Sequence, residues 1–237
     1  MEKRGSKLRM ITQEVEEESL NPNKIYGKEK KHILYRFIKR FIDILGGIVG
    51  TILLIPIMII VWIMRKKNKE DGPIFYEQLR IGKNGKTFRF YKFRSMVIGA
   101  DDTLKKYLAE NPKEAKEYKK YKKLKNDPRI TKTGEFLRKT SLDEWPQFIN
   151  VLNGTMSLVG PRPYLPREKE DMEEYYEYII KVKPGITGPW QAGGRSNVTF
   201  EDRMIIDKEY VRNRSLGKDL KIIIKTIAKV FIKEGAQ

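Results

Sequence analysis

Two adjacent carboxylates, Asp143 and Glu144, are the side chains of this sequence best suited to chemistry. The cation Arg138 precedes them. Carboxylate oxygens are the ligands that Mg²⁺ prefers, and a carboxylate whose charge is offset by cations can attack an electrophilic centre. The alternative is structural: both acids would occupy the first turn of a helix that Ser141 caps, where carboxylates stabilise the macrodipole. The pair alone does not decide between these interpretations.

A proline-flanked arginine follows, in the sequence Gly160-Pro161-Arg162-Pro163. Proline fixes the backbone dihedral φ, so this turn holds one guanidinium in a preset orientation. The planar fork of a guanidinium matches the oxygens of a phosphate group. We therefore expect Arg162 to bind a phosphate.

Five motifs then occur in one order along the chain. They are Lys92-Phe-Arg-Ser-Met96, Asp127-Pro-Arg-Ile130, Ser141-Leu-Asp-Glu144, Gly160-Pro-Arg-Pro163 and Lys183-Pro-Gly-Ile-Thr-Gly188. This series resembles that of the bacterial sugar transferases, the monotopic phosphoglycosyl transferases that initiate capsule, O-antigen and exopolysaccharide assembly. The resemblance covers roughly residues 36–232, and the series is far more specific than any single motif.

The resemblance implies transfer of a sugar-1-phosphate from a UDP-sugar to polyprenyl (undecaprenyl) phosphate, with release of UMP. Asp143 would attack the sugar-bearing phosphorus and form a covalent aspartyl-phosphosugar intermediate, with Glu144 as its catalytic partner. Mg²⁺ would be held by these two acids and by phosphate oxygens, since the chain has one histidine and no cysteine. The expected substrate-binding residues are Lys92, Arg94, Arg138, Arg162, Arg195 and Asp219.

The charge of the chain narrows the class of partner. A formal net charge of +18 points to nucleic acid, an acidic membrane leaflet or phosphorylated substrates. The absence of cysteine excludes disulfides and thiolate chemistry and fits a reducing cytosol. Two rival functions remain: a membrane-tethered nucleic-acid-binding protein, which would not depend on Asp143, and a non-catalytic scaffold of a polysaccharide assembly complex. We favour the enzyme, and thus no nucleic acid partner.

An apolar run from Ile44 to Met64 is the expected membrane segment. Its length of about 20 residues would suffice to cross a bilayer. Cations flank both ends, which places both ends in the cytoplasm by the positive-inside rule. Pro56 favours a kink or break inside the run. An ordinary transmembrane anchor explains the run as well, but the resemblance implies a re-entrant helix over 35–67, hinged at Pro56, on the cytoplasmic face of the bacterial inner membrane.

The remaining segments define the domains. Residues 1–34 read as a polar N-terminal extension without a signal peptide, and 68–237 as the membrane-associated catalytic domain. Longer relatives of the family carry additional membrane helices and a further domain before the catalytic part, so we expect a short form.

A β-hairpin is predicted over Gly72–Arg94, with strands Ile74–Arg80 and Thr87–Phe93 around the tight-turn signal Asn84-Gly85. Phe88, Phe90, Lys92 and Arg94 share one face of the second strand. This face passes from apolar to cationic, which suits a wall between core and anion site. Alternatively, the two cations are solubilising charges.

Several helices are expected. A lysine-rich helix over 101–126, interrupted at Asn111-Pro112, presents a solvated face or contacts anionic lipid headgroups. Further helices are predicted over Asp143–Leu152 and Glu168–Lys181. A basic amphipathic helix follows the N-cap Ser215, with its apolar side packed on the domain and its lysines toward anionic lipid. Asp219, in its first turn, either caps this helix or serves the site.

The predicted fold class is α+β, mainly helical, with a small β-hairpin, one N-terminal re-entrant membrane helix and amphipathic surface helices. The expected partners are a UDP-sugar, polyprenyl phosphate and anionic membrane lipids. The identity of the sugar, the length of the lipid and formation of a homo-oligomer are left open.

Overall fold

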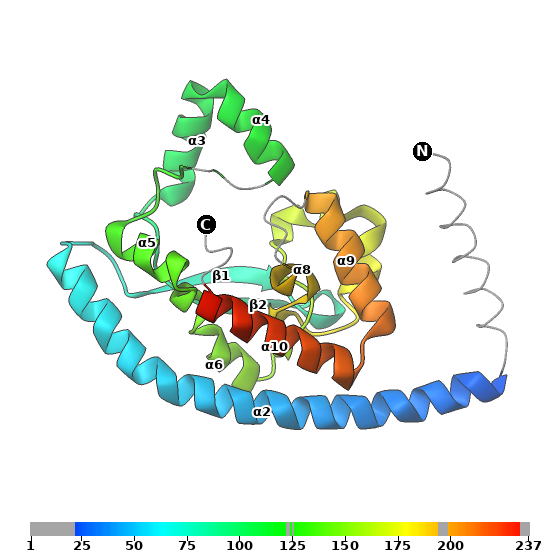
Figure 1. The fold of residues 1–237 in the computed structure, drawn as a ribbon. Coiled ribbons are helices and arrows are strands. Elements are labelled where there is room, and N and C mark those ends of the chain that lie inside the picture. The colour runs from blue at the N-terminus through cyan, green and yellow to red at the C-terminus, as the bar shows by residue number, and fades with distance from the viewer. Residues whose placement is uncertain (1–21, 122–123, 125, 194–198, 233–237) are drawn as a thin grey trace. The chain divides into compact units, whose positions relative to one another are not determined.

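The computed structural model describes residues 22–121, 124, 126–193 and 199–232, shown as a ribbon in Figure 1. The chain divides into two compact units at the boundary between Ile42 and Asp43. The described part of the first unit is helical and forms the beginning of α2 (Pro22–Lys67). The predicted polar extension over 1–34 therefore becomes helical from Pro22 onward, and residues 1–21 lie outside the described part.

Within the second unit, α2 is buried along one side from Asp43 to Arg65. The buried residues are Asp43, Gly47, Gly50, Leu54, Val61 and Arg65, and Ile57 and Met58 are partly buried. Together they recur every three or four residues, as expected for one face of a helix. Its other faces expose large apolar side chains such as Ile48, Val49 and Ile52. This half of the helix thus packs lengthwise on the domain and presents hydrocarbon elsewhere.

Glycine permits the close approach of α2 to the helix that follows the acidic pair, α6 (Gln147–Leu152). A Cβ atom at Gly50 would lie 2.2 Å from Cγ of Phe148. The indole Nε1 of Trp145 donates a hydrogen bond to the carbonyl oxygen of Gly50 at 2.8 Å. Gly50 is therefore the contact point between the apolar helix and the segment that carries the acids.

We predict that Gly50→Leu lowers the stability of the purified protein by about 3 kcal/mol, because its side chain overlaps the Phe148 ring. The check is thermal unfolding in detergent micelles. Val49→Leu is the matched control, since Val49 is 58 % exposed on the neighbouring face. Equal melting temperatures for the two variants would show that α6 does not pack on Gly50.

The helix continues through Pro56, so it does not break at this residue. A kink and a membrane hinge at Pro56 stay predictions. Proline removes one helical hydrogen bond, but the turns on both sides of it are held against the domain by Leu54 and Val61. In the part of the chain that the structure describes, Ile33–Lys67 is the one helix long and apolar enough to cross a membrane by length and composition. A re-entrant path remains a prediction.

The predicted hairpin is confirmed. Strands β1 (Phe75–Ile81) and β2 (Thr87–Phe93) pair antiparallel (Figure 1). Asn84 and Gly85 adopt φ of 58° and 74°, the left-handed values that a tight two-residue turn requires. At the end of β2, the opposite face of the strand is also buried, since Phe93 packs with Leu54, Val61 and Leu137. Residues of α2 and α5 (Lys132–Lys139) therefore cover the side opposite Phe90.

The predicted interruption of the lysine-rich segment at Asn111-Pro112 is also confirmed, by α3 (Ala100–Glu110) and α4 (Pro112–Tyr121). The helix predicted over Asp143–Leu152 differs. Residues Leu142–Glu144 form a single 3-10 turn, η2, and α6 begins only after Pro146. Ser141 precedes η2 with φ of 57°, and its side chain accepts no capping hydrogen bond, so it does not cap a helix as the structural alternative required. Pro146 lacks the N–H that would continue a helix from the acidic pair.

A parallel pair of short strands, β3 (Ser157–Val159) and β4 (Gly185–Thr187), was not predicted. It joins the arginine turn to the Gly/Pro-rich loop. The amide of Gly160 donates to Thr187 O at 3.0 Å, and the amide of Gly185 donates to Pro161 O at 2.9 Å. A Cβ at Gly185 would lie 2.1 Å from Gly160 N, so the two backbones approach this closely only because Gly185 has no side chain.

The predicted helix over Glu168–Lys181 is wrong. The segment forms short pieces: η3 (Pro166–Glu168), η4 (Glu170–Tyr175) and α7 (Tyr176–Ile179). Glu173 has φ of 44° and interrupts the helical backbone, within a stretch whose clustered acids repel one another.

The chain ends in α8 (Pro189–Ala192), α9 (Phe200–Asn213) and α10 (Leu216–Ile232), with α8 in contact with both longer helices (Figure 1). The predicted N-cap is confirmed, since Ser215 Oγ accepts from the amide of Lys218 at 3.3 Å. The predicted packing face of α10 is confirmed at Ile223, which packs on the domain, and wrong for most of its other residues. Ile222 packs on the domain, whereas Leu220, Ile224 and Ile227 are between 51 % and 58 % exposed.

Candidate active site

Lys92 joins the two acids. Its Nζ lies 2.7 Å from Glu144 Oε1 and 3.4 Å from Asp143 Oδ2. Strand β2 supplies the lysine and η2 supplies both carboxylates. The predicted alternation of β2 is confirmed here, because Phe90 is buried beside the ammonium group, 5.6 Å from its ring centroid. The predicted passage from core to charge is therefore confirmed at Lys92, but Arg94, predicted on the same face, does not reach the acids.

The two carboxylates differ in their electrostatics. Burial raises the pKa of Asp143, and the charge of Glu144 raises it further, against the opposing effects of Lys92 and Arg138. Burial also acts to raise the pKa of Glu144, but the charge and hydrogen bond of Lys92, with Arg162 and Arg80, hold it below its ordinary value. Asp143 is buried, whereas the Glu144 side chain is 36 % exposed. Asp143 is therefore the more basic carboxylate, and Glu144 is the one open to solvent.

Arg138 lies in the last turn of α5, and its Nε donates to Ser95 Oγ at 3.1 Å. Its charge acts to lower the pKa of Asp143, so its field reaches this carboxylate. The structure places this predicted residue at the site.

Arg162 is presented by a turn that is fixed through its backbone. The amide of Arg162 donates to Asp207 Oδ2 at 3.1 Å, and Arg80 Nη1 donates to the carbonyl oxygen of Pro163 at 2.9 Å. The charge of Arg162 contributes to lowering the pKa of Glu144. The structure therefore brings together Lys92, Arg138 and Arg162 around the acidic pair.

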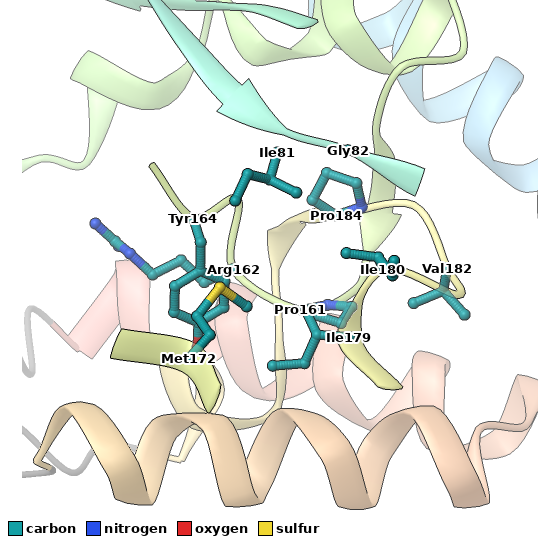
Figure 2. Close-up of a pocket in the computed structure, with 10 residues that line it drawn as sticks. All are labelled: Ile81, Gly82, Pro161, Arg162, Tyr164, Met172, Ile179, Ile180, Val182 and Pro184. Atoms are coloured by element: carbon teal, nitrogen blue, oxygen red, sulfur yellow. The ribbon is translucent and has the colours of Figure 1, made fainter. Parts of the chain in front are cut away.

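Figure 2 shows a small cavity beneath this turn. Its lining is mostly apolar, including Ile81, Tyr164 and Met172, and the guanidinium of Arg162 points away from it. A cavity volume of about 10 Å³ is close to the space of a single water. The cavity is thus a packing gap that supports the turn, and the polar chemistry lies on the guanidinium side.

Two further arginines belong to this cationic region and were missed by sequence reasoning. Arg80 stacks over the Phe90 ring at 5.1 Å, and burial together with the charge of Arg162 lowers its pKa to about 10. Arg203 lies 4.9 Å from the Trp190 ring centroid, on which Arg162 also lies at 5.8 Å. Burial and the charge of Arg162 lower the pKa of Arg203. The sequence offered one signal for Arg203, because it lies four residues before Asp207 and therefore on the same face of α9. No sequence pattern singled out Arg80.

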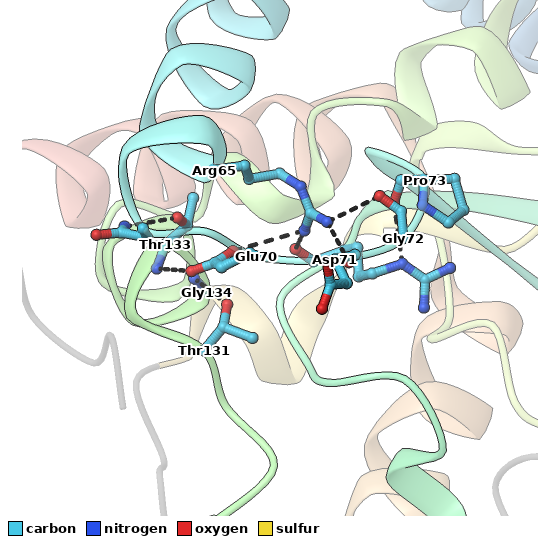
Figure 3. A network of polar contacts seen from close by, with 10 residues as sticks. Arg65, Glu70, Asp71, Gly72, Pro73, Thr131, Thr133 and Gly134 are labelled. Carbon is cyan, nitrogen blue, oxygen red and sulfur yellow. Dashed lines mark hydrogen bonds and ion pairs between the residues drawn. The ribbon is translucent and has the colours of Figure 1, made fainter.

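Arg94 lies elsewhere. Its Nε donates to Pro73 O at 2.9 Å, and its guanidinium stacks over Tyr76. The same network ties the end of α2 to α5, with Arg65 Nη2 donating to Asp71 O at 2.6 Å and Glu70 Oε1 accepting from the Thr133 amide at 2.8 Å (Figure 3). In this structure Arg94 fastens the segment that leads into β1, and its role in substrate binding stays a prediction.

Asp219 is buried and accepts a hydrogen bond from Tyr210 Oη at 2.7 Å. This contact joins α10 to α9, so the described interaction is structural. Arg195 falls within 194–198, outside the described residues.

The described residues contain no group of three or more His, Cys, Asp or Glu side chains that could hold a metal ion. Asp143 and Glu144 supply two carboxylates that already converge on one cation, the Lys92 ammonium. A magnesium ion bound through one or two carboxylates normally completes its shell with water and substrate phosphates. The donor set thus fits Mg²⁺ only together with a phosphorylated substrate.

Comparison with known proteins identifies similar sequences. The family model described as "Bacterial sugar transferase" matches residues 34–233. The undecaprenyl-phosphate galactose phosphotransferase of Salmonella typhimurium is 46 % identical over 201 residues, which cover 85 % of this chain and 42 % of that protein. The exopolysaccharide production protein ExoY of Rhizobium meliloti is 39 % identical over 198 residues, 84 % of this chain and 87 % of ExoY.

The UDP-glucose:undecaprenyl-phosphate glucose-1-phosphate transferase of Escherichia coli is 39 % identical over 209 residues, 85 % of this chain and 42 % of that protein. The chain therefore spans about two fifths of the length of several curated relatives that it matches, and nearly all of ExoY.

Proposed function

The chain belongs to the bacterial sugar transferase family, and from this we propose that it transfers a sugar-1-phosphate from a UDP-sugar to polyprenyl phosphate, releasing UMP. This would be the first step of a bacterial surface polysaccharide. The observation that carries the proposal is the Lys92 ammonium bridging Asp143 and Glu144, with Arg138 and Arg162 within electrostatic reach. Such a cluster can neutralise a diphosphate while one carboxylate stays basic enough to attack.

The chemistry is a double displacement at phosphorus. An oxygen of the Asp143 carboxylate attacks the phosphorus that bears the sugar, and the bond from this phosphorus to the UMP oxygen breaks. UMP leaves with that bonding pair, and the sugar phosphate remains on Asp143 as an acyl phosphate. A phosphate oxygen of the polyprenyl phosphate then attacks the same phosphorus, which releases the Asp143 carboxylate and yields the lipid diphosphate sugar.

The surrounding residues have separate roles in this proposal. Lys92 and Arg138 would stabilise the charge that gathers on the transferred phosphate, and Arg162 would hold the leaving UMP. Asp143 and Glu144 would also bind Mg²⁺ with phosphate oxygens; the ion supplies additional charge neutralisation on the diphosphate. The reaction needs no imidazole or thiolate, in agreement with a sequence that has no cysteine and one histidine.

The proposed location is the cytoplasmic face of the bacterial cell membrane. From Asp43 to Arg65, α2 packs along one side against the catalytic domain, through buried residues and, between Leu54 and Val61, through the partly buried Ile57 and Met58. That stretch includes most of the apolar run, so it cannot cross a bilayer as an isolated helix. The exposed apolar residues of α2 and the exposed Leu220, Ile224 and Ile227 of α10, flanked by lysines, suit an acidic membrane surface.

We predict that both flanks of α2 lie on the cytoplasmic side. Single cysteines introduced as Lys31→Cys and Lys67→Cys should both be shielded from an impermeant thiol reagent in intact cells, and both should react after permeabilisation. The native chain has no cysteine, so each signal comes from one site. Labelling of one of the two from outside would establish a membrane-crossing helix.

Turnover tests the function directly. Purified protein in micelles is incubated with Mg²⁺, polyprenyl phosphate and a panel of UDP-sugars that includes UDP-galactose and UDP-glucose, and UMP is measured. We expect lipid-dependent turnover with at least one sugar. A non-catalytic scaffold would bind without releasing UMP. A nucleic-acid-binding protein would instead show strong, salt-dependent affinity for RNA or DNA.

A further inference from the structure

We infer that Asp207, in α9, is a positioning residue: its carboxylate fixes the Pro161–Tyr164 backbone so that the Arg162 guanidinium is held ready for the diphosphate of the nucleotide-sugar. The ligand in this statement rests on the proposed function. The positioning role rests on the contacts of Asp207 in the structure, and Asp207 belongs to none of the five sequence motifs.

A single oxygen of Asp207 holds two points of the turn. Its Oδ2 accepts from the backbone amide of Arg162 at 3.1 Å and from the hydroxyl of Tyr164 at 3.0 Å. The Asp207 side chain is fully buried. The two donors belong to the residues on either side of Pro163, whose ring restricts its own φ, so the contact and the ring together fix this part of the backbone. Figure 2 shows Tyr164 on the apolar side of the turn and the Arg162 guanidinium directed away from it.

The carboxylate is not the group that stability alone would favour. Its second oxygen, Oδ1, is buried without a hydrogen bond from any residue that the structure describes. Burial raises the pKa of Asp207 to about 7, although the donors Arg162 and Tyr164 and the charges of Arg162 and Arg203 act in the opposite direction. Burial of this charge therefore costs stability, whereas an uncharged amide could accept the same two hydrogen bonds without that cost.

The negative charge of Asp207 offsets the repulsion between two neighbouring arginines. Arg162 and Arg203 both lie on the Trp190 ring, at 5.8 and 4.9 Å, and their like charges repel. The charges of both arginines act to lower the pKa of Asp207, whose side chain reaches from α9 to the turn. A buried anion behind two guanidinium groups lets them stay side by side before an anionic ligand arrives, and such preorganisation strengthens binding.

A double-mutant cycle tests this role. The dissociation constant for UDP is measured by calorimetry on the full chain in micelles, for the unmodified protein, Asp207→Asn, Arg162→Ala and the double variant. We expect Asp207→Asn to weaken UDP binding about tenfold when Arg162 is present and by less than about twofold when Arg162 is absent. Additive effects would mean that Asp207 does not act through Arg162, and the inference would fall.

Asp43 provides a matched control. It is another buried carboxylate, 3 % exposed, that accepts from a hydroxyl and an amide: Ser157 Oγ and Leu158 N, both at 2.9 Å. We expect Asp43→Asn to lower the melting temperature without changing the UDP dissociation constant. Asp207→Asn should do the reverse, weakening UDP binding with an equal or higher melting temperature above pH 7. A loss of stability alone in Asp207→Asn would assign it a merely structural role.

The sign of the pH dependence follows from linkage. The pKa of Asp207 is higher in the folded protein than its ordinary value of 3.8, so the folded state binds the proton more tightly. The stability of the unmodified protein relative to Asp207→Asn should therefore fall as pH rises from about 4 to 7 and stay level above.

A second variant separates this inference from the proposed function. In Asp207→Ala the acceptor is lost, so the amide of Arg162 should exchange with solvent deuterium at least about tenfold faster than in the unmodified protein. If the protein turns over no UDP-sugar, the proposed reaction is wrong. The positioning role is still tested in that case, by amide exchange and by the double-mutant cycle on UDP binding. Unchanged exchange at Arg162 in a folded Asp207→Ala protein would overturn it.

Discussion

Replacement of Asp143 by asparagine should lower kcat for UDP-sugar turnover by about 10⁴-fold or more, the magnitude typical for removal of a nucleophile. The amide keeps the size of the side chain but lacks the charge and basicity that the proposed attack on phosphorus needs. Because Lys92, Arg138 and Arg162 remain in place, UDP binding should change far less than turnover. The measurement is initial-rate UMP release together with the dissociation constant for UDP.

A matched Asp-to-Asn control is available on the surface. Asp102 is 86 % exposed in α3 and pairs only loosely with Lys105 at 3.6 Å. Asp102→Asn should have the kcat of the unmodified protein. A folded Asp143→Asn protein with near-normal kcat would remove Asp143 from the catalytic role.

Replacement of Lys92 by methionine should reduce kcat/KM about 100-fold at pH 7, since it removes the cation that joins both carboxylates. The pH profile carries a second signature. Lys92 acts to lower the pKa of both Asp143 and Glu144, so both acids should protonate at higher pH without it. The acidic limb of the rate profile should therefore shift to higher pH, and activity should be lost earlier as pH falls.

Lys92→Arg keeps the cation and should leave the acidic limb close to its original position. Lys86→Met, at an exposed position of the hairpin, should change neither rate nor profile. An unshifted acidic limb in Lys92→Met would show that this lysine does not control the ionisation of the acidic pair.

Those parts of the fold that depend on local chemistry could be predicted. Asn84-Gly85 specifies a tight turn through its own backbone preferences, and the alternation of Phe88, Phe90 and Lys92 follows from strand geometry. Together they account for the placement of Lys92 at the acids. The motif order pointed to the Arg162 turn, although not to what fixes it.

The remaining features depend on contacts between distant segments. Arg80 reaches Pro163 and Asp207 reaches Arg162 only because β1 and α9 meet the same turn, and neither residue belongs to a local pattern. Three-residue strands such as β3 and β4 are too short for a periodicity to reveal them. In α10, an apolar stripe predicts burial but does not tell a protein core from a lipid surface, so the prediction that this side packs on the domain fails at Leu220, Ile224 and Ile227.

The covalent intermediate is the central claim of the proposed mechanism, and intact-protein mass spectrometry tests it most directly. With a UDP-sugar that supports turnover, Mg²⁺ and no lipid acceptor, the protein should gain the mass of one sugar phosphate on the peptide that contains Asp143. UMP should appear in a burst no larger than the enzyme concentration, and added polyprenyl phosphate should discharge the adduct. Absence of an adduct after rapid quenching, with intersecting lines in double-reciprocal plots, would contradict the account and support direct transfer in a ternary complex.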